Sequence, residues 1–228
     1  MRALLRAFAL LPKLLLVLLP WTLRRPLLVR LYGYRLDPTA RLGWAWVYPD
    51  QLAMGPGSSI GHLTVCKGLA RLELGAHASI GRGNWITGFP AGDARHFAQR
   101  ADRRPELQLG DHAAITNRHI VDCTDRVEIG EYATFAGFRS QILTHSIDLR
   151  DNRQSCAPVR IGRYCFVGTG VTVLGGAVLP DHSVLGAMSL LNRAYAEPWM
   201  LYAGVPARPV RALDRSMRYL SRAVGFVD

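Results

Sequence analysis

The carboxy-terminal half of the chain places an aliphatic residue at every sixth position. The spacing holds without a slip at Ile161, Val167, Val173, Leu179, Leu185 and Leu191. The fifth residue of each unit is small or medium-sized until the last unit, and glycine follows the aliphatic residue at Gly162, Gly168 and Gly186. A period of six is neither helical nor that of a simple hairpin, so each aliphatic residue must return to one environment after a short strand and a turn. The pattern predicts a coil of short strands.

Weaker copies of the repeat precede this run, at Leu74, Ile80 and Ile86, at Leu109, Ile115 and Val121, and at Ile129 and Phe135. If three units form one turn of the coil, successive turns stack about 4.8 Å apart as parallel strands with the aliphatic side chains inside. A β-sandwich would place its turns every 8 to 12 residues or so, and βαβ units would need helical stretches. Residues 88–106 lack the repeat, so we expect a loop extruded from the coil.

The amino-terminal arm, residues 1–50, has a different character. Residues 4–19 are mostly apolar, but this stretch is interrupted and too short for a bilayer span of about 20 residues. We expect helices that either lie on an anionic leaflet or pack on the body or a partner subunit. A secretory signal peptide is a rival interpretation, although residues 20–25 (PWTLRR) stand where a small-residue cleavage site belongs.

Composition and charge exclude some classes of function. A chain of 228 residues, 49% hydrophobic and 20% charged, suits one folded unit with a small appendage. The net charge is +11, but residues 1–35 hold seven bases and no acid, which leaves 21 bases against 17 acids elsewhere. This asymmetry argues against a chain-wide nucleic-acid surface. The four cysteines have no disulfide or metal-binding spacing, which indicates thiols in a reducing compartment.

Two further motifs lie in the repeat region, residues 140–148 (SQILTHSID) and 204–211 (GVPARPVR). With the repeat, they resemble the hexapeptide-repeat acyltransferases over residues 60–213, and in particular the sugar O-acetyltransferase branch that includes colanic-acid-type enzymes. The resemblance implies a left-handed parallel β-helix over residues 51–195, apolar amino-terminal helices, and a closing motif with a short helix over 196–228. It further implies a homotrimer that transfers acetyl from acetyl-CoA to a sugar hydroxyl in polysaccharide or glycan biosynthesis. From the basic, apolar arm we expect a cytoplasmic protein that is peripheral on the inner membrane face.

His145 is the candidate general base, because an imidazole is well suited to take a proton from a hydroxyl near neutral pH. In the family that it resembles, the histidine of this motif has that role. Asp148 or Asp151 is close enough in sequence to orient the ring, although a backbone carbonyl would serve as well. From the preceding turn of the coil, we expect Asn117, His119 and Asp122 to lie near the acceptor, although a histidine such as His119 is more often structural.

Coenzyme A needs exposed backbone for its pantetheine arm and basic side chains for its phosphates. The family pattern is carried over onto seven positions: Gly168, Thr169, Ala187, Asn192, Arg193, Arg208 and Arg211. The assignment of the small residues depends on the resemblance, because a glycine in the repeat is also explained by its turn.

Other functions are also compatible with the sequence. The same coil would support acyl transfer to a sugar amine, or transfer from an acyl carrier protein. A zinc carbonic-anhydrase version needs three converging histidines, and only His112, His119 and His145 are even loosely arranged for that, so no metal is expected. A non-catalytic scaffold has no need of the two motifs.

Overall fold

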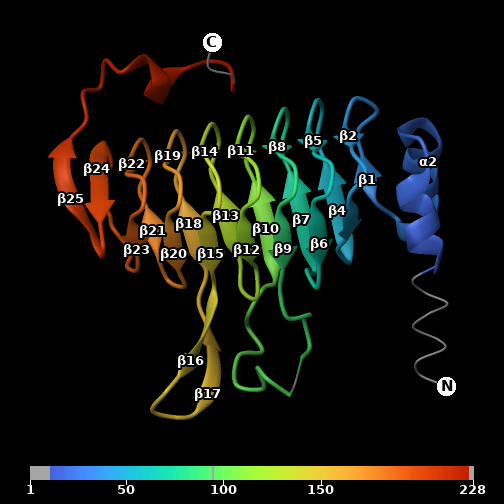
Figure 1. The fold of residues 1–228 in the computed structure, drawn as a ribbon, viewed down its shortest axis with the longest axis horizontal. Coiled ribbons are helices and arrows are strands. Elements are labelled where there is room, and N and C mark those ends of the chain that lie inside the picture. The colour runs from blue at the N-terminus through green and yellow to red at the C-terminus, as the bar shows by residue number, and fades with distance from the viewer. Residues whose placement is uncertain (1–10, 94, 226–228) are drawn as a thin grey trace.

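The computed structural model describes residues 11–93 and 95–225. Their strands wind into an elongated prism whose sides are three sheets of parallel strands (Figure 1), closed at one end by an antiparallel strand pair. Sheet 1 contains β1 (Arg35–Leu36), β4 (Gln51–Met54), β7 (Arg71–Leu74), β10 (Glu106–Leu109), β13 (Val127–Ile129), β18 (Val159–Ile161) and β21 (Val178–Leu179). Sheet 2 contains β2 (Arg41–Leu42), β5 (Ser59–Ile60), β8 (Ser79–Ile80), β11 (Ala114–Ile115), β14 (Thr134–Phe135), β19 (Phe166–Val167), β22 (Val184–Leu185), β24 (Met200–Gly204) and β25 (Ala207–Ala212). Sheet 3 contains β3 (Trp46–Tyr48), β6 (Val65–Lys67), β9 (Trp85–Thr87), β12 (Ile120–Asp122), β15 (Gln141–Leu143), β20 (Thr172–Leu174) and β23 (Leu190–Leu191).

Three six-residue units form one turn of the coil, as the period predicts. Ile161 pairs with Leu179, Val167 with Leu185 and Val173 with Leu191, and each pair is 18 residues apart, as in 179 minus 161. These six side chains are at most 1% exposed and fill the interior of the prism. The repeat therefore encodes the core directly, because every sixth side chain points inward.

Successive sheets meet at three edges, which we call edge 1–2, edge 2–3 and edge 3–1. Two excursions leave the prism at edge 3–1 (Figure 1): residues 88–105 between β9 and β10, and the hairpin of β16 (His145–Asp148) and β17 (Arg153–Cys156) between β15 and β18. The loop falls where the repeat is interrupted. After each excursion the register resumes, with Leu109 beside Leu74 and Ile161 beside Ile129.

Edge 1–2 carries a column of six stacked rings. Neighbouring centroids are 4.4 to 5.1 Å apart and the planes are within 16° of parallel. All six residues have φ between 54° and 59°, a conformation that bulky side chains rarely adopt. The stacking of the rings offsets part of the free-energy cost of this backbone conformation. The members are His77, His112, Tyr132, Tyr164, His182 and Trp199.

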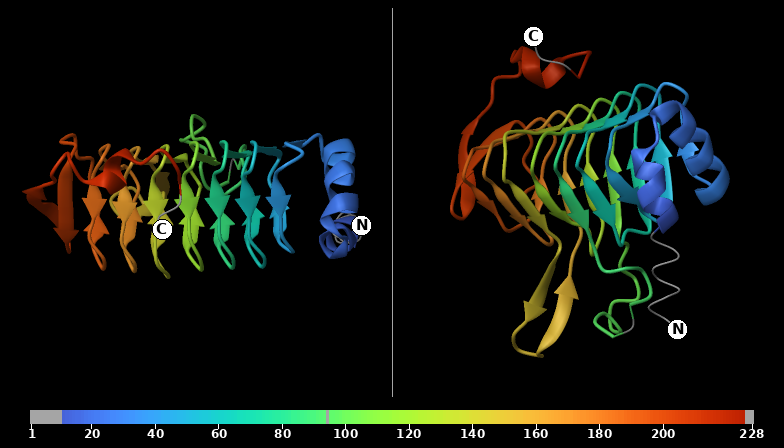
Figure 2. Two further views of the ribbon diagram at one scale, coloured as in Figure 1. Left: turned by 90° about the horizontal axis from the view of Figure 1, so that it is seen from above. Right: turned by 45° about the vertical axis from the view of Figure 1, so that its right-hand side comes forward.

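The amino-terminal end of the prism is covered by helices (Figure 2). Residues 11–18 are helical, and α2 (Trp21–Tyr32) follows and ends at Gly33, whose φ is 67°. Arg24 is 1% exposed and donates hydrogen bonds to the carbonyls of Gly43 (2.9 Å) and Ala45 (2.8 Å), so α2 caps the first turn of the coil. Within the described residues, none of the helices has the length and apolarity needed to cross a membrane.

The other end is closed by β24 and β25, which form an antiparallel pair. The chain then runs back along edge 1–2, where the Nδ1–H of His182 donates to the Leu220 carbonyl (3.0 Å) and the Tyr132 hydroxyl donates to the Ala223 carbonyl (3.2 Å). Up to residue 225, this segment contains one 3-10 turn, η1 (Arg218–Ser221).

Candidate active site

A histidine and an aspartate form a hydrogen-bonded pair at edge 3–1. Asp122 is the last residue of β12, and His145 follows the neighbouring strand β15 by two positions. Because Asp122 pairs in register with Leu143, the coil places the two side chains at the same edge one turn apart. The Nδ1 atom of His145 lies 2.8 Å from Oδ2 of Asp122.

Asp122 is 7% exposed and accepts hydrogen bonds on both carboxylate oxygens. Besides the imidazole, Oδ2 accepts from the Thr144 hydroxyl (2.8 Å) and from the backbone N–H groups of Thr144 (2.9 Å) and His145 (3.0 Å). Oδ1 accepts from the Thr124 hydroxyl (2.7 Å) and N–H (3.2 Å). Burial by itself raises the pKa of this carboxyl, but the hydrogen bonds from His145, Thr124 and Thr144 outweigh it and lower the pKa.

The pairing determines which nitrogen of His145 can act as a base. A carboxylate only accepts hydrogen bonds, so Nδ1 carries the proton and Nε2 of the neutral ring is the basic atom. The hydrogen bond to Asp122 raises the pKa of His145, with burial acting in the opposite direction. The side chain is 34% exposed, so solvent or a substrate can reach it.

A pocket of about 430 Å³ lies beside His145, at the base of the hairpin. Its walls come from both hairpin strands and from the two following turns of the coil. Asn192, one of the predicted coenzyme A residues, lies here. The lining residues are Leu143, Thr144, His145, Ser146, Ser155, Cys156, Ala157, Leu174, Gly175 and Asn192.

The loop of residues 88–105 also reaches the site, a role that the sequence did not predict. The Phe89 ring packs edge-on against the His145 ring, with centroids 5.5 Å apart. Arg103 holds this segment by donating to the carbonyls of Phe89 (2.7 Å) and Thr124 (3.1 Å). Arg100 donates to the Cys156 carbonyl in the hairpin and lies 3.3 Å from Asp125. The loop thus contacts both the His145 ring and the hairpin.

The expected orienting residues, Asp148 and Asp151, do not contact the imidazole. Asp148 lies at the far end of β16, opposite Arg153, because the antiparallel hairpin carries the chain away from His145. Its carboxylate accepts from the backbone N–H groups of Arg150 (2.9 Å) and Asp151 (3.3 Å), so it stabilises the hairpin turn. Asp122, which we expected near the acceptor, occupies the orienting position instead.

His119 and Asn117 lie at edge 2–3, away from the pocket. His119 is 0% exposed, accepts from the Ser140 N–H (3.2 Å) and lies 2.9 Å from the Thr116 hydroxyl, and burial lowers its pKa to about 4. Asn117 accepts from the Arg82 N–H (2.8 Å). Both residues therefore have structural roles, and no further side of His119 is left for a substrate.

Five of the seven predicted coenzyme A residues are divided between two edges of one chain. Arg193 is exposed next to Asn192, close to edge 3–1, whereas Gly168, Thr169 and Ala187 lie at edge 2–3. A Cβ atom on Gly168 would meet the backbone nitrogen of Ala187 at 2.6 Å, so close stacking of the turns already requires glycine there. The Thr169 hydroxyl accepts from the Phe138 N–H (3.0 Å).

Arg208 and Arg211 project from β25 at the carboxy-terminal end of sheet 2, and both are exposed. They are therefore accessible to a phosphate, but they lie at neither edge 2–3 nor edge 3–1.

The three histidines of the zinc alternative lie at three different edges. His112 belongs to the ring column at edge 1–2, His119 lies at edge 2–3 and His145 at edge 3–1. Within residues 11–93 and 95–225, no group of three or more His, Cys, Asp or Glu side chains could hold a metal ion.

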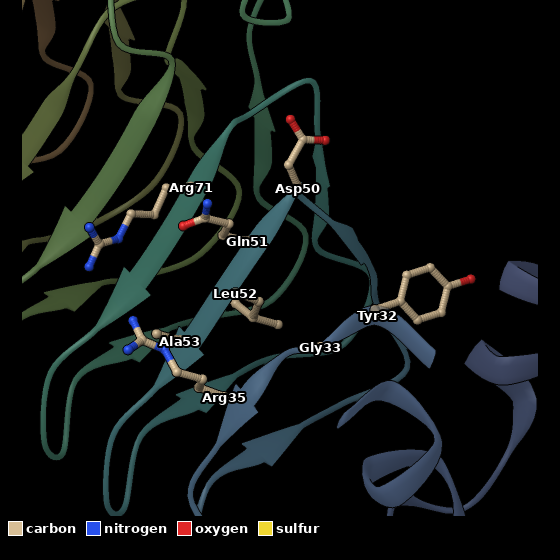
Figure 3. Close-up of a pocket in the computed structure, with 8 residues that line it drawn as sticks. All are labelled: Tyr32, Gly33, Arg35, Asp50, Gln51, Leu52, Ala53 and Arg71. Carbon is tan, nitrogen blue, oxygen red and sulfur yellow. The ribbon is translucent and has the colours of Figure 1, made fainter. Parts of the chain in front are cut away.

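A second pocket, of about 330 Å³, opens on the outer face of sheet 1 near the end of α2 (Figure 3). Arg35, Arg71 and Asp50 lie around it, together with Gln51 of β4. None of the residues of the His145 site lines this pocket, so the two pockets are separate.

Comparison with known proteins supports the fold. No family profile matches the chain. UDP-3-O-acylglucosamine N-acyltransferases of Methylorubrum extorquens and Methylorubrum populi are 28% identical over 136 residues, which cover 51% of this chain and 38% of theirs. The chain thus spans well under half the length of these curated relatives.

Two of the solved structures that resemble this one contain coenzyme A or acetyl coenzyme A. A hexapeptide-repeat acetyltransferase of Vibrio cholerae, in complex with acetyl coenzyme A, has a TM-score of 0.51 and 23% identity, and the match covers 62% of this chain and 71% of that one. A mutant of the N-acyltransferase AntD of Bacillus cereus, in complex with dTDP and coenzyme A, has a TM-score of 0.51 and 16% identity, covering 80% and 88%. The chain therefore has the parallel β-coil fold of hexapeptide-repeat acyltransferases.

Proposed function

We propose that this protein is an acyltransferase that moves an acetyl group from acetyl-CoA to a sugar hydroxyl in polysaccharide or glycan biosynthesis. The observation that carries the proposal is the pair of His145 and Asp122 beside an open pocket at the base of the hairpin. A buried carboxylate that fixes the tautomer of a partly exposed imidazole is the arrangement that a general base requires.

In the proposed reaction, Nε2 of His145 takes the proton of the acceptor hydroxyl while its oxygen attacks the thioester carbonyl. The tetrahedral intermediate collapses, the carbon–sulfur bond breaks, and the departing thiolate receives the proton from the imidazolium. Asp122 stabilises the imidazolium between these two steps through the hydrogen bond at Nδ1. Both substrates are bound together, and no acyl-enzyme intermediate forms.

The proposal includes a left-handed coil and a homotrimer. Asn192 lines the His145 pocket and Arg193 follows it in sequence, whereas Gly168, Thr169 and Ala187 lie at edge 2–3 of the same chain. A second copy could therefore present its edge 2–3 to the His145 pocket. In support of such packing, the outer face of sheet 3 exposes Trp85 (53%) and Ile120 (46%). Arg208 and Arg211 are assigned to the phosphates of coenzyme A. The protein would act in the cytoplasm, peripheral to the inner membrane face.

Transfer to a sugar amine is the second candidate, favoured by the names of the curated relatives and of AntD. The same base would accept the proton of an attacking amine. The two candidates differ in their products, since an ester is cleaved by mild alkali and an amide is not.

The test is to incubate the purified protein with acetyl-CoA and a panel of hydroxyl and amino sugars, and to measure thiol release. Mass spectrometry before and after mild alkali then identifies ester or amide. We expect alkali-labile products with wild type and at least about 100-fold slower product formation with His145→Ala. Thiol release that does not depend on His145 would contradict the proposal.

A further inference from the structure

The helix of residues 11–18 exposes a row of apolar side chains and directs its lysine toward the protein body. Leu11, Leu14, Leu15 and Leu18, spaced as one face of a helix, are 53% to 76% exposed. We call them the leucine stripe. On the opposite face Leu16 is buried at 5%, and Lys13 places its ammonium group 5.0 Å from the Tyr48 ring on the body. A helix that turns its lysine inward and its leucines outward is suited to an apolar medium on its outer side.

Charge decides between the two candidate occupants of the stripe, a lipid surface and a second copy of this chain. The first 35 residues hold seven bases and no acid. Of the five bases in residues 11–35, Arg24 is buried and Lys13 faces the body. Two packed arms would therefore bring together six positive charges, three from each arm, without an opposing acid from residues 11–35 of either one. An anionic leaflet supplies the opposite charge, and each base near such a surface contributes about 1 kcal/mol. Charge complementarity therefore favours lipid.

The hairpin beside the active site is a second apolar projection. Leu149 at its turn is 89% exposed and Ile147 is 54% exposed. The exposed charges nearby, Asp148 and Asp151 with Arg150 and Arg153, sum to zero, so they do not oppose contact with an anionic surface. Figures 1 and 2 show the hairpin leaving the prism on the side where the helix of residues 11–18 begins.

We propose that the leucine stripe and the hairpin tip rest on one anionic lipid surface, and that the acceptor is a saccharide anchored in that surface. This inference rests on the proposed function. It adds the class of acceptor: a sugar carried on a lipid, presented to a pocket that opens at the base of a membrane-contacting hairpin.

The length of the hairpin restricts the acceptor further. Leu149 follows His145 by four residues, and a strand rises about 3.3 Å per residue, so the tip extends about 13 Å beyond the base. The reacting hydroxyl therefore stands about 13 Å above the surface that Leu149 contacts. That distance suits a sugar held off the lipid by a linking group, and excludes the part of the lipid at the acyl boundary.

The first experiment measures binding without any acceptor. The full-length protein is floated with vesicles of phosphatidylcholine alone or mixed with phosphatidylglycerol. We expect binding to the anionic vesicles only, weakening as NaCl rises from about 0.05 to 0.5 M. Replacing Leu14 and Leu18 together (Leu14→Ser with Leu18→Ser) should lower the partition coefficient by about tenfold or more. The matched control is Val210→Ser, because Val210 is 57% exposed at the opposite end of the prism.

The second experiment compares one saccharide acceptor in two forms, free in solution and anchored in anionic vesicles. Leu149→Ser should lower the rate on the anchored form several-fold and leave the rate on the free form unchanged. Leu149→Phe, which keeps an apolar side chain at the tip, should retain the wild-type rate on the anchored form. Activity on the free form tests the proposed function separately from the lipid inference.

Several outcomes would overturn the inference. These are equal binding to neutral and anionic vesicles, no binding at low salt, and self-association by light scattering that Leu14→Ser with Leu18→Ser abolishes. The last would identify a second copy as the occupant. An equal loss with Leu149→Ser on both acceptor forms would also overturn it, since the hairpin would then act on the pocket alone.

Discussion

Replacing Asp122 by asparagine tests the assignment of the catalytic pair. The substitution keeps the shape of the side chain and one oxygen, so an amide oxygen at the Oδ2 position can still accept from Thr144 and His145. It removes the negative charge that faces the imidazolium. A hydrogen bond to a charged group contributes about 1.5 to 3 kcal/mol. If that contribution is realised in the transition state, kcat falls by about 10- to 150-fold.

The pH dependence gives the more specific readout. In wild type, the pKa of His145 is raised by Asp122, and the ring must be neutral to act as a base. The acidic limb of the kcat/KM profile should therefore move to lower pH in Asp122→Asn, while the plateau falls. Initial rates across the pH range, measured by thiol release, check both effects. The matched control is Asp148→Asn in the hairpin turn, which should leave the profile unchanged.

The same pair makes a prediction about stability. The pKa of His145 is raised on folding, so its contribution is complete below the unfolded value of 6.5 and is lost as the pH rises through the raised pKa. The pKa of Asp122 is lowered, so its contribution is present above 3.8 and is lost as the pH falls through the lowered pKa. The difference in free energy of unfolding between wild type and Asp122→Asn should be largest between about pH 4 and 6.5, and smaller near pH 9.

Three results would refute this reasoning. The first is a fall in rate with no movement of the acidic limb, and the second is a limb that moves to higher pH. The third is a loss with Asp148→Asn as large as that with Asp122→Asn, which would return the orienting role to the hairpin.

Three further variants test other parts of the structure. His145→Ala should lower kcat by about 10² to 10⁴ and leave the Kd of coenzyme A unchanged, which calorimetry can check. Arg208→Ala with Arg211→Ala should raise the KM for acetyl-CoA more than it lowers kcat, because contacts far from the thioester contribute mostly uniform binding. An unchanged KM would place the phosphates elsewhere. Arg24→Ala should lower the free energy of unfolding by about 3 to 6 kcal/mol, since it removes two charged hydrogen bonds that cap the coil. Denaturant unfolding measures this, and a change below about 1 kcal/mol would contradict the capping role.

The core of the coil could be predicted from the sequence because its determinant is local. A side chain returns to the interior after every six residues, so Ile161 to Leu191 identify their own environment. The same count also predicts the edge of the prism at which each connection between two strands lies, because connections three units apart stack at the same edge. Applied to Gly168 and Asn192, the count assigns these two predicted coenzyme A residues to different edges, in agreement with the sheets that they follow.

The partner of His145 was harder to predict because the turns differ in length. Leu143 pairs with Asp122, 21 residues earlier, whereas Ile161 and Leu179 are 18 apart. Without a fixed period, the residue beneath His145 cannot be found by counting, and a carboxylate nearby in sequence is the natural choice. Phe89 was missed for a similar reason, since the path of an extruded loop depends on anchors such as Arg103 that carry no periodic signal.

The two excursions at edge 3–1 have a consequence for engineering. Each leaves the coil and returns to it in register, so its length is not fixed by the stacking of the turns. Doubling the length of a flexible loop costs only about 0.6 kcal/mol. Edge 2–3 has no such freedom, because a Cβ on Gly168 would already collide with the turn above. Transplanting a hairpin or loop from another chain of this fold should therefore exchange acceptor preference as a module, with the coil and the base at position 145 left in place.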